Sequence, residues 1–128
     1  MSVKGDNIHF RTGPGKNYRI KWIYSDGVPV EVIERKDNWV KVRDFEDDSG
    51  WLNKTFLSTH PHAIVKANRS NDESINIRSG PSSESSIVGI AYYGVVFKVL
   101  ELHSGWVKVR HKTGLTGWIS SNLLWGGF

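Results

Sequence analysis

The stretch Trp39-Val40-Lys41-Val42-Arg43 decides the fold, because it occurs a second time, letter for letter, as Trp106-Val107-Lys108-Val109-Arg110. The second copy lies 67 positions after the first, and the same offset aligns positions 8 to 57 with the second half without a gap. Similarity at a fixed period is the signature of a repeated structural unit. The chain is therefore predicted to hold two copies of one small domain, which we call unit one (1–60) and unit two (63–128).

Matching residues extend well beyond the duplicated strand. They include Ile8 and Ile75, Arg11 and Arg78, Gly13 and Gly80, Pro14 and Pro81, Gly50 and Gly117, and Trp51 and Trp118. Units of about 60 residues bury only a modest part of their surface, so large aromatic side chains must supply much of each core. The six tryptophans of the chain fit that need.

Apolar residues recur at every second position in short runs separated by Gly, Asn, Ser and Asp, which is typical of β-strands with one buried face. The expected inward residues are Val28, Val30 and Val32 in unit one and Val95, Phe97 and Val99 in unit two. In the duplicated strand the valines are expected to face inward, which leaves Trp, Lys and Arg outside. We expect an all-β fold of two small closed barrels in tandem, in which closure removes exposed strand edges.

The connections carry further signals. A tight hairpin turn is expected to end at Asn38 and at Gly105, because both residues tolerate positive φ. A single 3₁₀ turn is expected over 53–57 and again over 120–124. The segment Ile64-Val65 is either the last strand of unit one or the first strand of unit two, and the second reading requires a five-residue insertion near 68–72. In either case the link is short, so the units are expected to pack against each other.

Composition excludes several classes of protein. The net charge of +4 is mild and the signs are mixed, which argues against a nucleic-acid-binding surface. No apolar run reaches the roughly 18 residues of a membrane span, and cysteine is absent. The first residues contain no apolar signal-peptide core.

At this point the sequence resembles a known family, the bacterial SH3 (SH3b) domains. In unit two the resemblance rests on residues 75–83, 94–100, 105–110 and 116–121. In unit one it rests on residues 11–15, 28–32 and 38–39, which resemble the variant found in alphaproteobacterial SH3-like proteins. It implies tandem SH3-like barrels. Members of the family are often exported and attached to cell-wall enzymes, where they bind peptidoglycan or its peptide stems. The resemblance therefore implies a periplasmic or cell-envelope location if an upstream signal has been removed, and we expect a cytoplasmic location otherwise.

Aromatic residues are the candidate ligand-binding residues. Trp39 and Trp106 would offer flat apolar faces beside cations, although both rings could instead pack beneath the long loop. Trp51 and Trp118 are also predicted to face outward, with partial burial at the barrel rim as the alternative. The loop tyrosines differ between the units and are either ligand contacts or contacts between the units: they are Tyr18, Tyr24, Tyr92 and Tyr93.

Arg11 and Arg78 precede a Gly-Pro pair, and their expected partners are loop carbonyls rather than a ligand carboxylate. His60-Pro61-His62 lacks a third metal ligand, so no metal is expected. No catalytic motif appears and no cofactor is expected. The sequence therefore predicts a non-enzymatic module that binds peptidoglycan or its peptide stems, and a protein adaptor that binds an extended peptide is the alternative.

Overall fold

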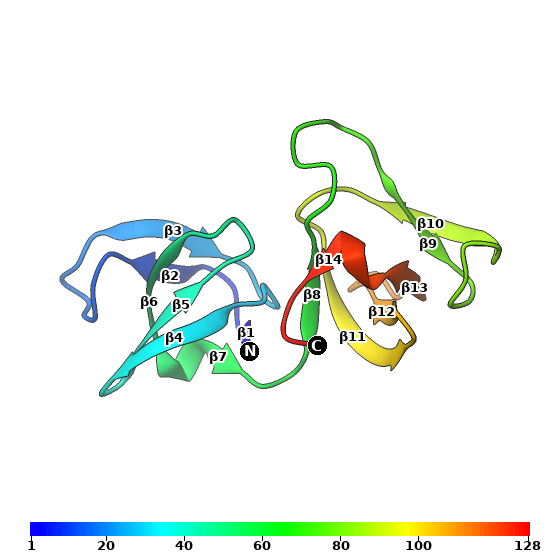
Figure 1. Cartoon of the computed structure of the whole chain (residues 1–128). Helices are drawn as coiled ribbons and strands as arrows, with labels where there is room; N and C mark the ends of the chain where they lie inside the picture. The colour runs from blue at the N-terminus through cyan, green and yellow to red at the C-terminus, as the bar shows by residue number, and fades with distance from the viewer.

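The computed structural model describes residues 1–128 as two small β-sheet units that lie side by side (Figure 1). Unit one contains β1 (Ser2–Val3), β2 (Ile8–Arg11), β3 (Ile20–Tyr24), β4 (Glu31–Lys36), β5 (Trp39–Arg43), β6 (Ser49–Asn53), the 3₁₀ helix η1 (Lys54–Phe56) and β7 (Leu57–Ser58). Unit two contains β8 (His62–Val65), β9 (Ile75–Arg78), β10 (Ile87–Ala91), β11 (Val96–His103), β12 (Trp106–Arg110), β13 (Thr116–Ser120), η2 (Ser121–Leu123) and β14 (Leu124–Trp125). The all-β prediction is confirmed, and a single 3₁₀ turn occurs at the expected place in each unit.

Strand order is the same in the two units. Unit one has a five-stranded sheet in the order β3-β2-β6-β5-β4 and a separate pair β1-β7, and unit two has a seven-stranded sheet in the order β10-β9-β13-β12-β11-β8-β14. Strand β8 pairs with both β11 and β14, so Ile64-Val65 belongs to the sheet of unit two. Val65 pairs with Leu124 as Val3 pairs with Leu57. The additional residues of unit two therefore lie in the loop between β8 and β9.

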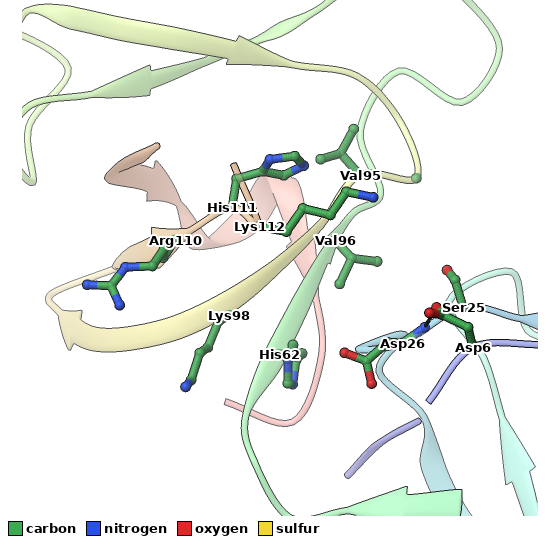
Figure 2. Close-up of a pocket in the computed structure, with 11 residues that line it drawn as sticks. Asp6, Ser25, Asp26, His62, Val95, Val96, Lys98, Arg110, His111 and Lys112 are labelled. Carbon is green, nitrogen blue, oxygen red and sulfur yellow. Dashed lines mark hydrogen bonds between the residues drawn. The ribbon is translucent and has the colours of Figure 1, made fainter. Parts of the chain in front are cut away.

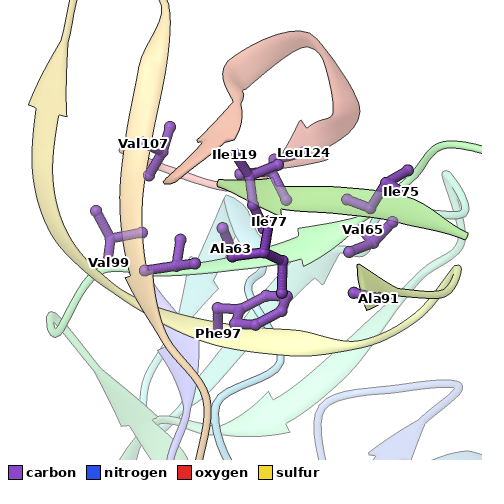
Figure 3. Packing of buried hydrophobic residues seen from close by; sticks show 11 residues of the cluster. Ala63, Val65, Ile75, Ile77, Ala91, Phe97, Val99, Val107, Ile119 and Leu124 are labelled. Atoms are coloured by element: carbon purple, nitrogen blue, oxygen red, sulfur yellow. The ribbon is translucent and has the colours of Figure 1, made fainter. Parts of the chain in front are cut away.

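Each unit has its own apolar core, made by the inward face of the alternating strands. The valines of the duplicated strand are fully buried in both copies, as predicted, while the tryptophans, lysines and Arg43 between them are half-buried. The core of unit one consists of Val3, Ile8, Phe10, Tyr24, Val28, Val30, Val40, Val42 and Leu52. The core of unit two, drawn in Figure 3, consists of Ala63, Val65, Ile75, Ile77, Ala91, Phe97, Val99, Val107, Val109, Ile119 and Leu124.

The hairpin turns differ from the prediction in one detail. In unit two Gly105 has φ 86° and Ser104 before it has φ 43°, so both turn residues have positive φ. In unit one the positive φ falls on Asp37, at 55°, and Asn38 adopts ordinary backbone. The predicted tight turn is confirmed in both units, because Lys36 pairs with Trp39 and His103 pairs with Trp106 across two residues. Only the residue with positive φ differs in unit one, since Asp also tolerates the left-handed region.

The two units touch through side chains of the loops that face each other. The rings of Phe45 and Tyr93 lie 5.3 Å apart between centroids, and Arg69 pairs with Glu46 at 3.3 Å. Gly27 lies against the second unit so closely that a Cβ there would meet His62 at 3.0 Å. These contacts agree with the short link between the units. No helix in the structure is long and apolar enough to cross a membrane.

Candidate ligand-binding clefts

Trp39 and Trp106 each line an open hollow on the surface of their own unit, with volumes of about 390 Å³ and 380 Å³. We call these hollows cleft one and cleft two. Cleft one is lined by Asn7, Ile8, His9, Arg11, Lys16, Trp39, Asn53, Thr55 and Phe56. Cleft two is lined by Ser74, Ile75, Asn76, Arg78, Ser83, Trp106, Ser120 and Leu123.

The two clefts are the same site in two copies. Each of the 8 residues that line cleft two stands 67 positions after a residue that lines cleft one. Three of the corresponding pairs are identical, namely the isoleucine, the arginine and the tryptophan. The fold therefore produces a hollow at this place twice, with a half-buried indole in its wall each time.

Each cleft is lined by strand β2 or β9, by the indole at the start of β5 or β12, and by the 3₁₀ turn. Trp39 pairs in register with Asn53, and Trp106 pairs with Ser120. The amide of Lys54 donates to the carbonyl of Asn38 at 2.8 Å, which holds η1 against the hairpin turn. The side chain of Asn53 caps η1 by accepting from the amide of Thr55 at 3.1 Å. These bonds place the last residue of the turn, Phe56 or Leu123, beside the indole.

The long loop after β2 or β9 forms the opposite wall, and an arginine holds it in place. Nη1 of Arg11 donates to the carbonyls of Lys16 and Tyr18, each at 3.0 Å. Nη1 of Arg78 donates to the carbonyl of Ser85 at 3.0 Å in the same way. The predicted use of these arginines on loop carbonyls is confirmed.

The polar groups of the two clefts differ. Arg11 donates through Nη2 to Nδ1 of His9 at 3.2 Å, so the free nitrogen Nε2 of His9 carries the proton. Cleft one thus presents a histidine, a lysine at Lys16 and a second aromatic ring at Phe56. Cleft two has Asn76, Ser83 and Leu123 at these positions. Cleft one is more cationic and more aromatic.

Trp51 and Trp118 do not offer the exposed faces that the alternation predicts. Both are only 9% exposed, so the prediction of an outward contact surface is wrong for them. The register places Trp51 between Arg11 and Lys41, and Trp118 in the same position of unit two, so long side chains flank each indole on the outer face. The His103 ring also packs edge-on against Trp118, with 6.4 Å between centroids.

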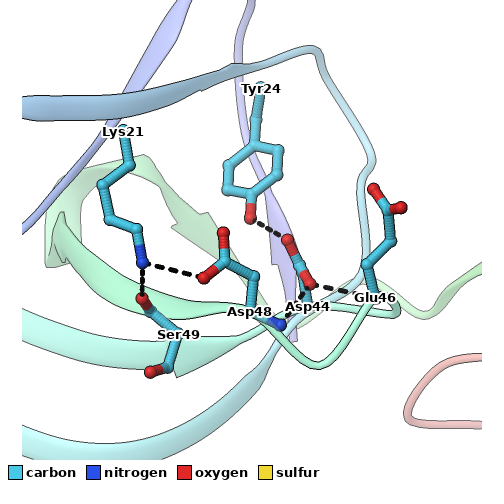
Figure 4. A network of polar contacts seen from close by, with 6 residues as sticks. All are labelled: Lys21, Tyr24, Asp44, Glu46, Asp48 and Ser49. Carbon is cyan, nitrogen blue, oxygen red and sulfur yellow. Dashed lines mark hydrogen bonds and ion pairs between the residues drawn. The ribbon is translucent and has the colours of Figure 1, made fainter.

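Tyr24 lies in the core of unit one and is 8% exposed, so the prediction that it contacts ligand is also wrong. Its hydroxyl donates to Oδ2 of Asp44 at 2.5 Å (Figure 4). Burial, followed by the hydrogen bond to Asp44, raises the pKa of Tyr24 far above its ordinary value. Oδ1 of Asp44 accepts from the amides of Glu46 and Asp48, each at 3.0 Å, and closes the turn after β5.

The remaining tyrosines lie outside both clefts. Tyr18 and Tyr92 are exposed, and the ring of Tyr18 lies directly over Gly13, where a Cβ would come within 2.3 Å of it. Tyr93 packs against Phe45 of unit one and so takes the inter-unit role that the sequence left open. Burial and a hydrogen bond to Glu46 raise the pKa of Tyr93.

Sequence reasoning missed the polar residues of the clefts, of which His9, Lys16 and Asn53 are examples. The sequence contains one signal for them, since these residues and their counterparts lie beside segments that match at the 67-position offset. The sequence does not state, however, that the arginine folds the long loop toward the indole.

Comparison with known proteins agrees with the fold. Residues 4–59 and residues 73–124 each match a family described as bacterial SH3 domain. The chain is 25% identical over 131 residues to a putative N-acetylmuramoyl-L-alanine amidase, YrvJ, of Bacillus subtilis (strain 168). The match covers 98% of this chain and 25% of that protein, so the chain spans about a quarter of the length of this curated relative.

Solved structures give weaker matches. NlpC2 and NlpC1 from Trichomonas vaginalis are 16% and 20% identical, each with a TM-score of 0.43 over 99% of this chain, and the match covers 49% and 48% of those chains. An NlpC/P60 family protein from Bacillus cereus is 18% identical with a TM-score of 0.38, over 75% of this chain and 35% of that one.

Proposed function

Because the chain belongs to the bacterial SH3 family as two domains in tandem, we propose that it is a non-catalytic module that binds the peptide part of peptidoglycan in the bacterial cell envelope. The observation that carries the proposal is the recurrence of one cleft at the same positions of both units, with an indole in each. If the two units were similar only because they share a fold, their core residues would be alike, but the surface cleft would not need to occur in both. A repeated hollow is the expected form of a repeated binding site.

The chemistry of cleft one suits a short peptide that carries carboxylates and amides. Trp39 offers a flat apolar face, on which an aliphatic side chain or the face of an amide packs. The amine of Lys16 and the Nε2 proton of His9 would hold a carboxylate through charge-assisted or ordinary hydrogen bonds. Oδ1 of Asn53 is occupied by Thr55, which leaves the Nδ2 protons of Asn53 free for a peptide carbonyl.

The relative in Bacillus subtilis supports the choice of ligand. Its name describes a putative amidase of N-acetylmuramoyl-L-alanine, in which a sugar acid is joined to the amino acid L-alanine. We infer that this chain binds the same class of material. Two clefts on one chain would strengthen weak binding to a polymer, because the second contact forms within an existing complex.

Sedimentation with purified sacculi tests this function. We expect the wild-type chain to pellet with the sacculi and the double variant Trp39→Ala, Trp106→Ala to remain in the supernatant. Trp22→Ala is the matched control, because Trp22 is 53% exposed and lies outside both clefts. Since both cleft indoles are only half-buried, the melting temperature of the double variant should fall by no more than about 8 °C.

Three results would count against the proposal. A wild-type chain that does not pellet rules out binding to the wall. Equal loss of pelleting in the Trp22→Ala control would show that the clefts are not the site. A collapse of the melting temperature in the double variant would make the indoles core residues.

A second candidate function is favoured by a separate observation. Strands β3 and β10 are the end strands of their sheets and carry exposed apolar side chains, which are Ile20, Trp22 and Ile23 in unit one and Ile87, Val88 and Ile90 in unit two. Such an edge suits an extended segment of a partner protein, which would add a strand. This adaptor function predicts that Ile23→Lys and Ile90→Lys abolish capture of the partner, whereas the Trp39→Ala, Trp106→Ala variant retains it.

A further inference from the structure

A groove of about 600 Å³ lies between the two units, apart from both clefts (Figure 2). Its wall on unit two carries His62, Lys98 and Arg110, which we call the cationic row. Lys98 of β11 pairs in register with His62 of β8 on one side and with Arg110 of β12 on the other. Residues directly opposite on neighbouring strands share one face of the sheet, so the row extends about 10 Å across three strands.

The cationic row has no acidic partner. None of the four ion pairs in the structure includes Lys98 or Arg110. Nδ1 of His62 contacts the carbonyl of His60 at 3.0 Å, so that nitrogen carries a proton and only Nε2 is left for other contacts. Two like charges directly opposite each other in a sheet destabilise the pairing.

The corresponding place in unit one is arranged differently. Glu31 stands where unit two has Lys98, and it pairs with Arg43, the counterpart of Arg110. Asp47 pairs with the same arginine at 3.1 Å, and its counterpart in unit two is Gly114. The strand pair is therefore built with a neutralised arginine in one copy and with two facing cations in the other. Folding does not require the second arrangement, and an anionic ligand would explain it.

The opposite wall of the groove limits where an anion lies. Asp6 and Asp26 of unit one are part of that wall. The amide of Gly5 donates to Asp26 at 2.7 Å, and the amide of Asp26 donates to Asp6 at 3.2 Å. These two carboxylates repel an anion from the side of unit one and so confine it to the cationic row. Lys112, also on the groove wall, adds a further cation beside Lys98 and Arg110 on the side of unit two.

We propose that the cationic row is a binding site for a ligand with two or more phosphate or carboxylate groups. The site is independent of the clefts and of the function proposed for them. Spacing of the groups along an extended ligand would match the spacing of the strands. The amine of Lys98 and the guanidinium of Arg110 would each bind one group through charge-assisted hydrogen bonds.

The test uses the whole chain and two probes, inorganic tripolyphosphate and tricarballylate, with titration calorimetry at low ionic strength. Lys98→Glu recreates the acid–arginine pair of unit one, so we expect affinity for the bound probe to fall about tenfold or more. The same variant should unfold in urea at an unchanged or higher concentration. Lys36→Glu is the matched control, because Lys36 is exposed, forms no ion pair and gives the same change in net charge. We expect it to weaken binding by less than about twofold.

Each outcome decides the question. Binding of tripolyphosphate alone identifies a phosphate ligand, binding of tricarballylate alone identifies a carboxylate ligand, and binding of both supports the shared chemistry, provided that Lys98→Glu weakens it. Absence of binding by both probes overturns the proposal. So does an affinity that Lys98→Glu leaves unchanged, or one that Lys36→Glu weakens to the same extent.

Discussion

The two units share a strand letter for letter, yet their interiors are filled in different ways. In unit one the ring of Phe10 packs at a tilt against Tyr24, with 5.0 Å between centroids. In unit two the same positions hold the smaller residues Ile77 and Ala91. The volume that unit two lacks at this place must come from another strand, because cores pack to a nearly constant density.

Phe97 of β11 supplies part of that volume, where unit one has Val30. Its ring packs against the ring of His111, with 5.6 Å between centroids. His111 stands where unit one has the buried acid Asp44. Aromatic volume in the core thus lies on different strands in the two units, while the strands themselves correspond. The polar group at this position differs as well: unit one has the buried hydrogen bond of Asp44, and unit two has the half-exposed imidazole of His111.

The largest expected effect comes from removing the aromatic ring on which unit two depends. We expect Phe97→Ala to cost about 3–5 kcal/mol, because it leaves a cavity in a filled core. Val30→Ala, at the same position of unit one, should cost about 2 kcal/mol. Urea denaturation followed by circular dichroism measures both. Equal losses would contradict the idea that aromatic volume has moved from one strand to the other.

The next effect concerns the buried acid. Asp44→Ala leaves the hydroxyl of Tyr24 and the amides of Glu46 and Asp48 without their acceptor, and we expect a loss of about 2–3 kcal/mol. His111→Ala, the matched change in unit two, should cost about 1 kcal/mol or less. Urea denaturation with hydrogen exchange of each unit separates the two. A larger loss for His111→Ala would contradict the expectation that Asp44 contributes more to stability than His111.

A third effect depends on pH. The fold raises the pKa of Tyr24 above the ordinary value of 10.0. Above that value the unfolded chain loses a proton that the folded chain keeps, so the contribution of Tyr24 to stability is lost as the pH rises beyond 10. We expect Tyr24→Phe to cost about 1 kcal/mol at neutral pH and to reduce the alkaline loss. Unfolding free energies from pH 8 to pH 11 measure this, with the exposed Tyr92→Phe as the control. If the unfolding free energy of Tyr24→Phe falls with pH as steeply as that of the wild type, Tyr24 is not the cause of the alkaline loss.

The smallest effect on stability distinguishes the two clefts. Trp39→Ala and Trp106→Ala should each cost about 1 kcal/mol of folding stability, because both indoles are half-buried. Their effects on sacculus binding should differ. We expect Trp39→Ala to reduce binding more, since cleft one adds His9, Lys16 and Phe56 to its indole. Quantitative sedimentation of the single variants measures the difference. Equal reductions would mean that these three residues add nothing.

Much of the fold follows from the sequence because a repeat gives each pattern twice. The inward valines, the 3₁₀ turns and the small barrels are predicted correctly. The predictions for Trp51 and Trp118 fail for a physical reason. Alternation states which side of a strand a residue faces, and it does not state what covers that side.

Tyr24 illustrates a different limit. As a residue that differs between the units, it suggested a ligand contact, but Asp44 differs at the same time, and the two form one buried pair. Reading such differences jointly would have pointed to the interior. The clefts and the groove could not be predicted, because both depend on how loops distant in the sequence fold over the strands.

The contact between the units has one consequence for long ligands. Tyr93 and Arg69 fasten unit two to the turn after β5, so the two clefts keep a constant separation rather than the variable one that a flexible tether would give. Such a pair of clefts distinguishes polymers by the length of their repeat. A polymer whose repeat matches that separation engages both clefts at once, and a polymer with another repeat engages one.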